Sequence, residues 1–223
     1  MATNKIIVGA SLALCTLVLS QCTSTSNQRN VMKTNRKSTY PVDDLIIDRW
    51  SPRAMSGQDI SNQELMSLFE AARWAPSSYN NQPWRFIYAH RNTDSWSKLF
   101  NLFVPFNQSW TKDAAALVLV ISSKNFAHNG QPSRTHSFDT GAAVENLALQ
   151  ATSMGLVCHA MEGFDYDKAR TAFNIPEDYD IEAMLAIGRP APASRLPQEL
   201  QEREVPSDRK PLDSFVFNGT FKQ

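Results

Sequence analysis

The alternation of apolar and polar positions predicts helices and strands in mixed order along the chain. The clearest helix start is the capping box Ser61-Asn62-Gln63-Glu64, in which a serine and a glutamate bond each other's backbone N–H groups. Apolar residues follow at helical spacing, and Pro76 ends the element. Further helices are predicted over residues 95–103, 139–154 and 165–173, the last capped by Asp165.

Four strands are predicted, over residues 84–89, 116–121, 156–161 and 181–187. The second of these is continuously apolar, which is typical of a strand buried on both faces. No repeat or internal linker divides residues 40–221, so the pattern predicts one domain of α+β or α/β class. We place this domain at residues 41–223 and expect the charge-rich residues 195–213 to form a solvated arm.

The first 40 residues follow a different pattern. Residues 6–19 are an apolar run, shorter than the roughly 20 residues of a membrane span but of the size of a signal peptide's apolar region. The run resembles a bacterial lipoprotein signal ending at Cys22, although Gln21 stands where a small residue is expected. We therefore expect a leader over residues 1–22 with a lipid anchor at Cys22, and a polar linker over residues 23–40. The alternative is that translation starts at Met32, which gives a cytoplasmic protein.

Composition and charge narrow the classes of function. The chain has 223 residues with 22 Lys+Arg and 22 Asp+Glu, and this zero net charge argues against a nucleic-acid-binding protein. Only 8 glycines are present, so we expect cationic side chains rather than a glycine-rich loop to hold any bound phosphate. Cys158 is expected to be a buried apolar residue, and the four histidines lack metal-binding spacing, so no metal site is predicted.

Two polar segments carry most of the candidate chemistry. Arg49 and Arg53 flank Ser51, and on a helix both guanidiniums would share one face. Guanidinium groups bind phosphate through two parallel hydrogen bonds, but a solvated basic helix start is the alternative. Residues 75–84 place hydroxyls and carboxamides between two prolines, which suits the edge of a flat heterocycle or an ordinary connecting loop.

Three shorter segments add candidates, each with a structural alternative. Asn107 stands beside aromatic residues, from where its amide could bind a ring edge, or it lies in an exposed loop. Gly163 lets the backbone approach a ligand closely, or it belongs to a plain turn. Residues 207–212 contain cationic side chains near the C-terminus. They could fold back to bind a phosphate, or they form only a charged tail.

In their order and spacing, these motifs together resemble the FMN-dependent nitroreductase family. The matching motifs, over residues 40–221, are R-x-S-x-R, E-A-A-R-W-A-P-S-S-x-N-x-Q-P-W, N-x-x-W, D-T-G-A-A-x-x-N-L-x-L-x-A, E-G-F-D and a late R-K-P-L. The resemblance implies an α+β sandwich with a central mixed sheet flanked by helices. It also implies an intertwined homodimer with FMN at the subunit interface.

The resemblance further implies which residues contact FMN. The phosphate and the pyrimidine side of the ring would be held by the segment Arg49, Trp50, Ser51 and Arg53. Arg209 is similar to a late phosphate cation, with Arg195 as its rival. The ring would be contacted by the Asn107 amide and by the backbone of Glu162 and Gly163, which faces the nitrogen that accepts hydride. The loop that the partner subunit contributes to the site would contain Pro76, Ser77, Ser78 and Asn80. Asp139 would be one further contact to the cofactor.

The implied activity is electron transfer from NAD(P)H through FMN to a small flat acceptor such as a nitroaromatic or a quinone, in two half-reactions. No catalytic side chain is expected, because the flavin carries the chemistry. An acceptor pocket is expected to be lined by Tyr79, Phe103, Phe106, Trp110 and Phe126. Two alternatives stay open: the same flavin fold with fragmentation, dehydrogenation or dehalogenation chemistry, and a lipid-anchored binding protein without cofactor. Export would also separate the enzyme from NAD(P)H.

Overall fold

The computed structural model describes residues 32–221. The predicted leader, the anchor at Cys22 and most of the predicted linker lie outside the described residues. The remainder of that linker, up to Tyr40, contains no helix or strand. In the described part, no helix combines the length and the apolar character needed to cross a membrane.

Four strands form one sheet in the order β1-β2-β4-β3. Their bounds are Trp84–His90 (β1), Ala116–Ser123 (β2), Val157–Met161 (β3) and Tyr179–Gly188 (β4). All four predicted strands are confirmed, with ends shifted by a few residues. The three pairings among the described strands are antiparallel, whereas a mixed sheet was expected.

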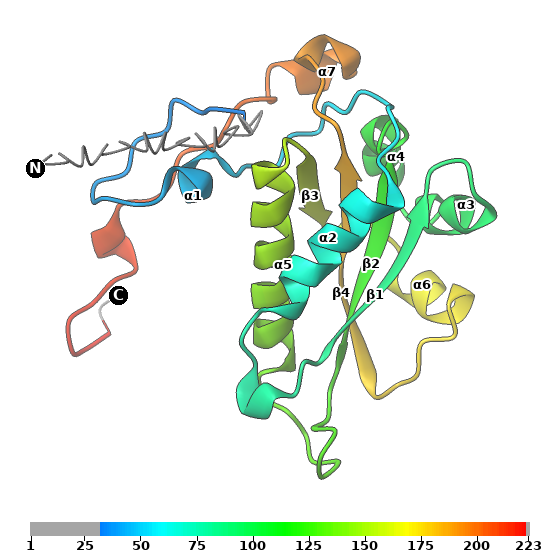
Figure 1. The fold of residues 1–223 in the computed structure, drawn as a ribbon, viewed down its shortest axis with the longest axis vertical. Helices are drawn as coiled ribbons and strands as arrows, with labels where there is room; N and C mark the ends of the chain where they lie inside the picture. The colour runs from blue at the N-terminus through cyan, green and yellow to red at the C-terminus, as the bar shows by residue number, and fades with distance from the viewer. Residues whose placement is uncertain (1–31, 222–223) are drawn as a thin grey trace, which may run out of the picture.

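Two long helices cover one face of the sheet (Figure 1). They are α2 (Asn62–Arg73) and α5 (His136–Ser153), and both were predicted. The capping box of α2 is present as expected: the Ser61 hydroxyl accepts a hydrogen bond from the Glu64 N–H at 3.1 Å, and the Glu64 carboxylate accepts one from the Ser61 N–H at 2.8 Å. Leu65, Leu68 and Leu147 are completely buried between these helices and the sheet.

Three short helices contribute to the core on the opposite face. They are α3 (Asp94–Phe100), α4 (Pro105–Thr111) and α6 (Tyr166–Ala172). Asp165 caps α6 as predicted, by accepting a hydrogen bond from the Lys168 N–H at 2.9 Å. The α4 helix was not predicted; it begins at Pro105, a residue suited to the first helical position, and its buried members include Trp110.

Two further short helices lie near the chain ends: α1 (Asp44–Asp48) and α7 (Gln198–Gln201). The expectation of a fully solvated arm over residues 195–213 was wrong at its start, because Leu196 and Leu200 are buried in the core. Beyond residue 205 the chain leaves the sandwich and extends away from the sheet (Figure 1).

Candidate functional site

A cavity of about 300 Å³ collects arginine side chains from three separated segments of the chain. Its lining comprises Arg36, Arg49, Trp50, Ser51, Arg53, His159, Arg203, Val205, Ser207 and Arg209. The structure therefore brings together five of the predicted site residues: Arg49, Trp50, Ser51, Arg53 and Arg209. A cavity with five guanidiniums is chemically suited to an anion with several oxygen acceptors.

Arg49 and Arg53 reach this cavity from a backbone that is not helical. The α1 helix ends at Asp48, and Arg49 is already extended, with φ −65° and ψ 118°. The helical arrangement considered for the two arginines is therefore not the one present. Alternate side chains of an extended segment point the same way, so Arg49, Ser51 and Arg53 still share a side.

Two carboxylates hold these arginines in place. Arg49 Nε lies 3.1 Å from Glu145 Oε1 on α5. Glu204 Oε1 accepts hydrogen bonds from the backbone N–H groups of Arg53 at 2.6 Å and Ala54 at 2.7 Å. The side chain of Glu204 is 4% exposed, and its second oxygen lies 3.9 Å from Arg53 Nη1. The C-terminal segment is therefore pinned to the R-x-S-x-R motif at the cavity.

His159, on β3, is the only titratable cavity residue described here that is not an arginine. Its Nδ1 lies 3.1 Å from the Pro52 carbonyl oxygen, and its ring centroid lies 4.7 Å from that of Trp110. Burial, with a further contribution from the charge of Arg53, lowers the pKa of His159 to about 4. The neutral ring therefore packs as part of the wall at neutral pH.

This depressed pKa predicts acid sensitivity. Between the unfolded pKa near 6.5 and the folded pKa near 4, the unfolded chain binds a proton that the folded chain does not, so stability falls as the pH is lowered through this window. When the pH is lowered from 7 to 5, we expect His159 to reduce the free energy of unfolding by about 2 kcal/mol, as measured by urea denaturation. The variant H159Q should lose that part of the pH dependence. H128Q, which replaces an exposed histidine, is the matched control; equal slopes for H159Q and wild type would contradict the assignment.

Asn107, Glu162 and Gly163 lie at a second place, beyond the end of β3. The Asn107 side chain is buried on α4, and its Nδ2 donates a hydrogen bond to the Gly163 carbonyl oxygen at 3.0 Å. A Cβ atom on Gly163 would lie 2.5 Å from that same nitrogen. Position 163 therefore requires glycine for close approach, which supports the reading of this segment as more than a plain turn.

The arginine cavity and the Asn107–Gly163 pair are connected through β3 and α4. His159 in the cavity wall stands four residues before Gly163, a span of roughly 13 Å in extended chain. Trp110, which packs on His159, belongs to the same helix as Asn107. The fold thus places the arginine cavity near one end of β3 and the Asn107 carboxamide beyond the other.

The loop with the remaining predicted residues lies elsewhere in the chain. Pro76, Ser77, Ser78 and Asn80 do not line the arginine cavity. Three residues of this loop, Tyr79, Asn80 and Gln82, have positive φ values of 53°, 51° and 48°. Such strained conformations persist only where the surroundings enforce them.

Asp139 is the residue that enforces part of this loop conformation. Its buried carboxylate accepts hydrogen bonds from the Ser78 N–H at 3.0 Å and the Thr135 hydroxyl at 3.2 Å. Within one chain, Asp139 therefore anchors the loop to the start of α5. In the part of the chain that the structure describes, Asp139 does not line the arginine cavity.

The five aromatic side chains expected to line an acceptor pocket are not gathered in one place among the described residues. Phe103 and Trp110 are buried in the core, so their assignment to an acceptor pocket was wrong. Tyr79 and Phe126 do form an edge-to-face pair with centroids 5.6 Å apart, and Phe106 is exposed. Cys158 is buried as expected, and burial raises the pKa of its thiol to about 12, which leaves it unreactive.

Among the described residues, two serine hydroxyls, those of Ser122 and Ser137, lie within hydrogen-bond distance of the His136 ring. Ser122 Oγ lies 2.7 Å from His136 Nδ1 and also donates a hydrogen bond to Glu182 Oε1, which accepts from Ser137 as well. Ser122 is completely buried, and its proton is directed to the carboxylate. The geometry is that of a structural network rather than an activated nucleophile. Among residues 32–221, no group of three histidine, cysteine, aspartate or glutamate side chains is arranged to hold a metal ion.

Four cavity residues were not among the candidates from the sequence: Arg36, His159, Arg203 and Val205. Each is distant in sequence from the R-x-S-x-R motif, and the signal for Arg203 was hidden in a charged stretch that had been read as solvated. Arg195, the rival of Arg209, lies outside the cavity and instead approaches Asp113 at 3.8 Å. The geometry therefore favours Arg209 as the late cation.

Comparison with known proteins identifies the family. The model of the nitroreductase family matches residues 46–189. The chain belongs to the nitroreductase family. A solved structure described as an oxidoreductase containing FMN is 45% identical to this family member, with a TM-score of 0.82, covering 85% of this chain and 97% of that one.

Named relatives of this nitroreductase-family chain support the same assignment. An NADH dehydrogenase from Thermus thermophilus is 25% identical over 215 residues, or 81% of this chain and 98% of the relative. An oxygen-insensitive NADPH nitroreductase from Helicobacter pylori is 41% identical over 69 residues, or 31% and 32% of the two chains. Family membership confirms the resemblance, the α+β fold class and the expectation of an oxidoreductase enzyme.

Proposed function

We propose that this protein binds FMN and transfers electrons from NAD(P)H to a small flat acceptor such as a nitroaromatic or a quinone. The observation that carries the proposal is the arginine cavity, joined by β3 to the close contact between Asn107 and Gly163. The similar solved structure cited above is described as containing FMN, and the two cited relatives are named for NADH or NADPH chemistry.

The donor set in the cavity fits the phosphate end of FMN. A phosphate dianion offers three acceptor oxygens, and guanidinium forks match that geometry while remaining charged at any usable pH. Arg49, Arg53 and Arg209 would hold the phosphate, with the Ser51 hydroxyl beside them. The ion pairs to Glu145 and Glu204 keep Arg49 and Arg53 ordered, so little side-chain entropy is lost on binding.

The other end of the site fits the flavin ring. FMN, when bound, supplies the chemistry: it accepts hydride from a nicotinamide and passes two electrons on. The side chain of Asn107 and the backbone of Glu162 and Gly163 would orient the edge of the ring. Because Gly163 has no Cβ atom, the ring could approach this backbone closely. No side-chain nucleophile is needed for this role.

A second copy of the chain would complete the site as an intertwined homodimer. The chain beyond residue 205 leaves the sandwich (Figure 1). Its apolar side chains Phe215, Val216 and Phe221 are exposed in the single chain, as is typical of a surface that contacts another protein. The strained loop at Ser77–Gln82, anchored by Asp139, carries the polar side chains Ser77, Ser78 and Asn80 away from its own arginine cavity. We propose that this loop serves the cavity of the partner.

The purified full-length protein provides the test. We expect a yellow protein of dimeric mass by light scattering, whose heat-released flavin has the mass of FMN, and whose oxidation of NADPH or NADH accelerates when a nitroaromatic or a quinone is added. R53Q, in the cavity, should weaken FMN binding at least tenfold, because a charged hydrogen-bond donor is lost. R73Q, on the exposed surface of α2, should not.

The alternatives give different outcomes in the same assays. Flavin binding without nicotinamide oxidation would support fragmentation, dehydrogenation or dehalogenation chemistry on this fold. A colourless protein that takes up no FMN on reconstitution would refute the proposed function and favour a binding protein without cofactor.

A further inference from the structure

The segment Lys33–Arg36, which we call the N-terminal strap, is docked on the end of α1. The Thr34 N–H donates a hydrogen bond to Asp48 Oδ1 at 2.9 Å, and Lys33 Nζ lies 2.9 Å from Asp48 Oδ2. The Asp48 side chain is only 5% exposed. Burial opposes the charge on this carboxyl, but the hydrogen bonds from Lys33 and Thr34 outweigh it and lower the pKa of Asp48. The strap is therefore held in place at neutral pH.

The docked strap directs Arg36 to the arginine cavity. Arg36 Nη1 donates hydrogen bonds to the backbone oxygens of Arg49 at 3.0 Å and Ile47 at 3.4 Å. Both bonds use Nη1, and Nε is buried without a hydrogen-bond partner among residues 32–221. Since Arg36 also lines the cavity, its guanidinium retains donor capacity at the place where Arg49 and Arg209 converge.

The charge environment of Arg36 is unfavourable in the chain alone. Burial, followed by the charges of Arg209 and Arg49, lowers the pKa of the Arg36 guanidinium, and the charge of Asp208 opposes this only in part. Arg49 and Arg53 have carboxylate partners in Glu145 and Glu204, whereas the described residues place no carboxylate within ion-pair distance of Arg36. An anion in the cavity would remove this repulsion and bind the unused donor.

We propose that Arg36 binds the cofactor phosphate directly, and that the N-terminal strap is a wall of the FMN site. This inference rests on the proposed function and adds to it a residue that lies before the part of the chain matched by the family model, residues 46–189. The strap then links cofactor binding to the ordering of the chain's N-terminal segment. It follows that the loss of Arg36 should affect recognition of the phosphate and not of the ring.

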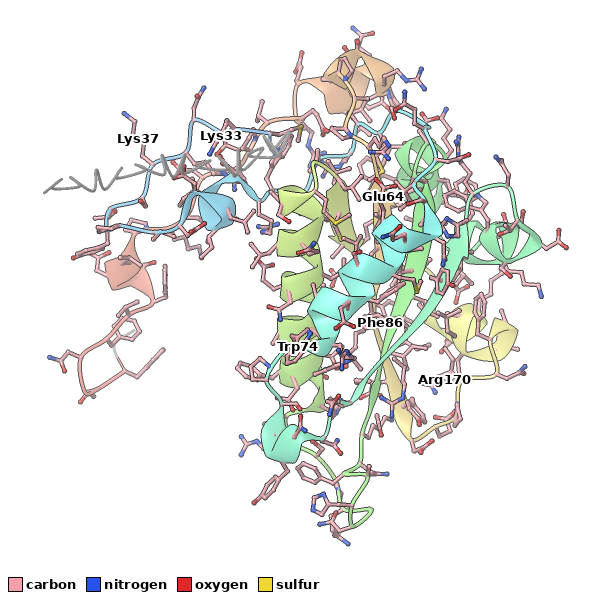
Figure 2. All side chains as sticks on the ribbon, viewed as in Figure 1. Lys33, Lys37, Glu64, Trp74, Phe86 and Arg170 are labelled. Atoms are coloured by element: carbon pink, nitrogen blue, oxygen red, sulfur yellow. The ribbon has the colours of Figure 1, made fainter. Side chains whose placement is uncertain are left out.

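FMN and riboflavin distinguish these two effects, because they share the ring and differ in the phosphate. The experiment titrates each flavin into the flavin-stripped full-length protein and follows the quenching of flavin fluorescence. For R36Q we expect the Kd for FMN to rise about tenfold and the Kd for riboflavin to stay within twofold. The control is K37Q, which removes a neighbouring cation that does not line the cavity; Figure 2 shows Lys33 and Lys37 on the same segment. K37Q should leave both values within twofold.

Each outcome decides the inference. An unchanged Kd for FMN in R36Q, or an equal weakening of both flavins, overturns it, since the second result describes a structural role. If R36Q fails to fold, R36K decides instead: it keeps the charge but loses the planar fork, and should weaken FMN about threefold without changing riboflavin. If the wild-type protein binds neither flavin, the proposed function itself fails, whereas tight FMN binding by both wild type and R36Q removes only the role of Arg36.

Discussion

Replacing Glu204 with alanine should lower the free energy of unfolding by about 3 kcal/mol. This carboxylate is almost completely buried and accepts hydrogen bonds from two successive backbone N–H groups, those of Arg53 and Ala54. Its removal leaves both donors unpaired, and each unsatisfied buried group costs roughly 1–3 kcal/mol. The affinity for FMN should also fall, because the hydrogen bonds of Glu204 fix the position of the C-terminal segment that carries Arg209.

Denaturant unfolding of E204A, E204Q and E202A tests this prediction. E204Q keeps an oxygen that can accept both bonds and should lose roughly 1 kcal/mol, the difference between charged and neutral acceptors. E202A removes an exposed carboxylate two residues earlier and should stay within about 0.5 kcal/mol of wild type. If E204A unfolds at the same denaturant concentration as E202A, Glu204 does not anchor the segment.

Substituting Gly163 with alanine should reduce the proposed NADPH-dependent turnover at least tenfold and cost about 2 kcal/mol of stability. The new Cβ would lie 2.5 Å from Asn107 Nδ2 and 3.4 Å from Val104 Cγ2. The Asn107 amide must then turn away from the Gly163 carbonyl oxygen, and a buried polar group loses its partner. The matched control is G141A on α5, where no atom lies within 4 Å of the added Cβ and alanine favours the helix.

A double-mutant cycle isolates the contact between Asn107 and Gly163. N107A removes the atom that the new methyl group meets, so G163A should add little destabilisation in the N107A background. Flavin-linked turnover and denaturant unfolding are both measured on the four proteins. Additive losses would show that Gly163 matters for a reason other than the Asn107 amide.

The sequence predicted those elements whose signals are local. The capping box of α2 and the apolar run of β2 each identify an element without reference to the rest of the chain, and both are present. The α4 helix was not predicted, because the polar residues after Phe106 leave no helical apolar pattern. Pro105 is a residue favoured at the first helical position and was the one available signal. Strand order required contacts between distant segments, which no local pattern encodes.

The candidate site was predictable only through the motifs that carried the family resemblance. Arg49, Arg53 and Arg209 meet in one cavity as expected, but through an extended backbone rather than a helix. Arg36 and Arg203 could not be found, because nothing in their own neighbourhoods distinguishes them from solvated arginines. Leu196 and Leu200 are buried, but only Leu200 lies on a helix, α7, and Leu196 is extended before Pro197, so no single helical period predicted their burial.

The docking of Lys33 and Thr34 on Asp48 would limit how far the domain could lie from an anchor at the N-terminal side. If Cys22 carries a lipid, as the sequence predicts, Lys33 follows this cysteine by eleven residues. Fully extended, such a tether spans at most about 40 Å. The arginine cavity, which Arg36 of the same strap lines, would then stay close to the membrane surface.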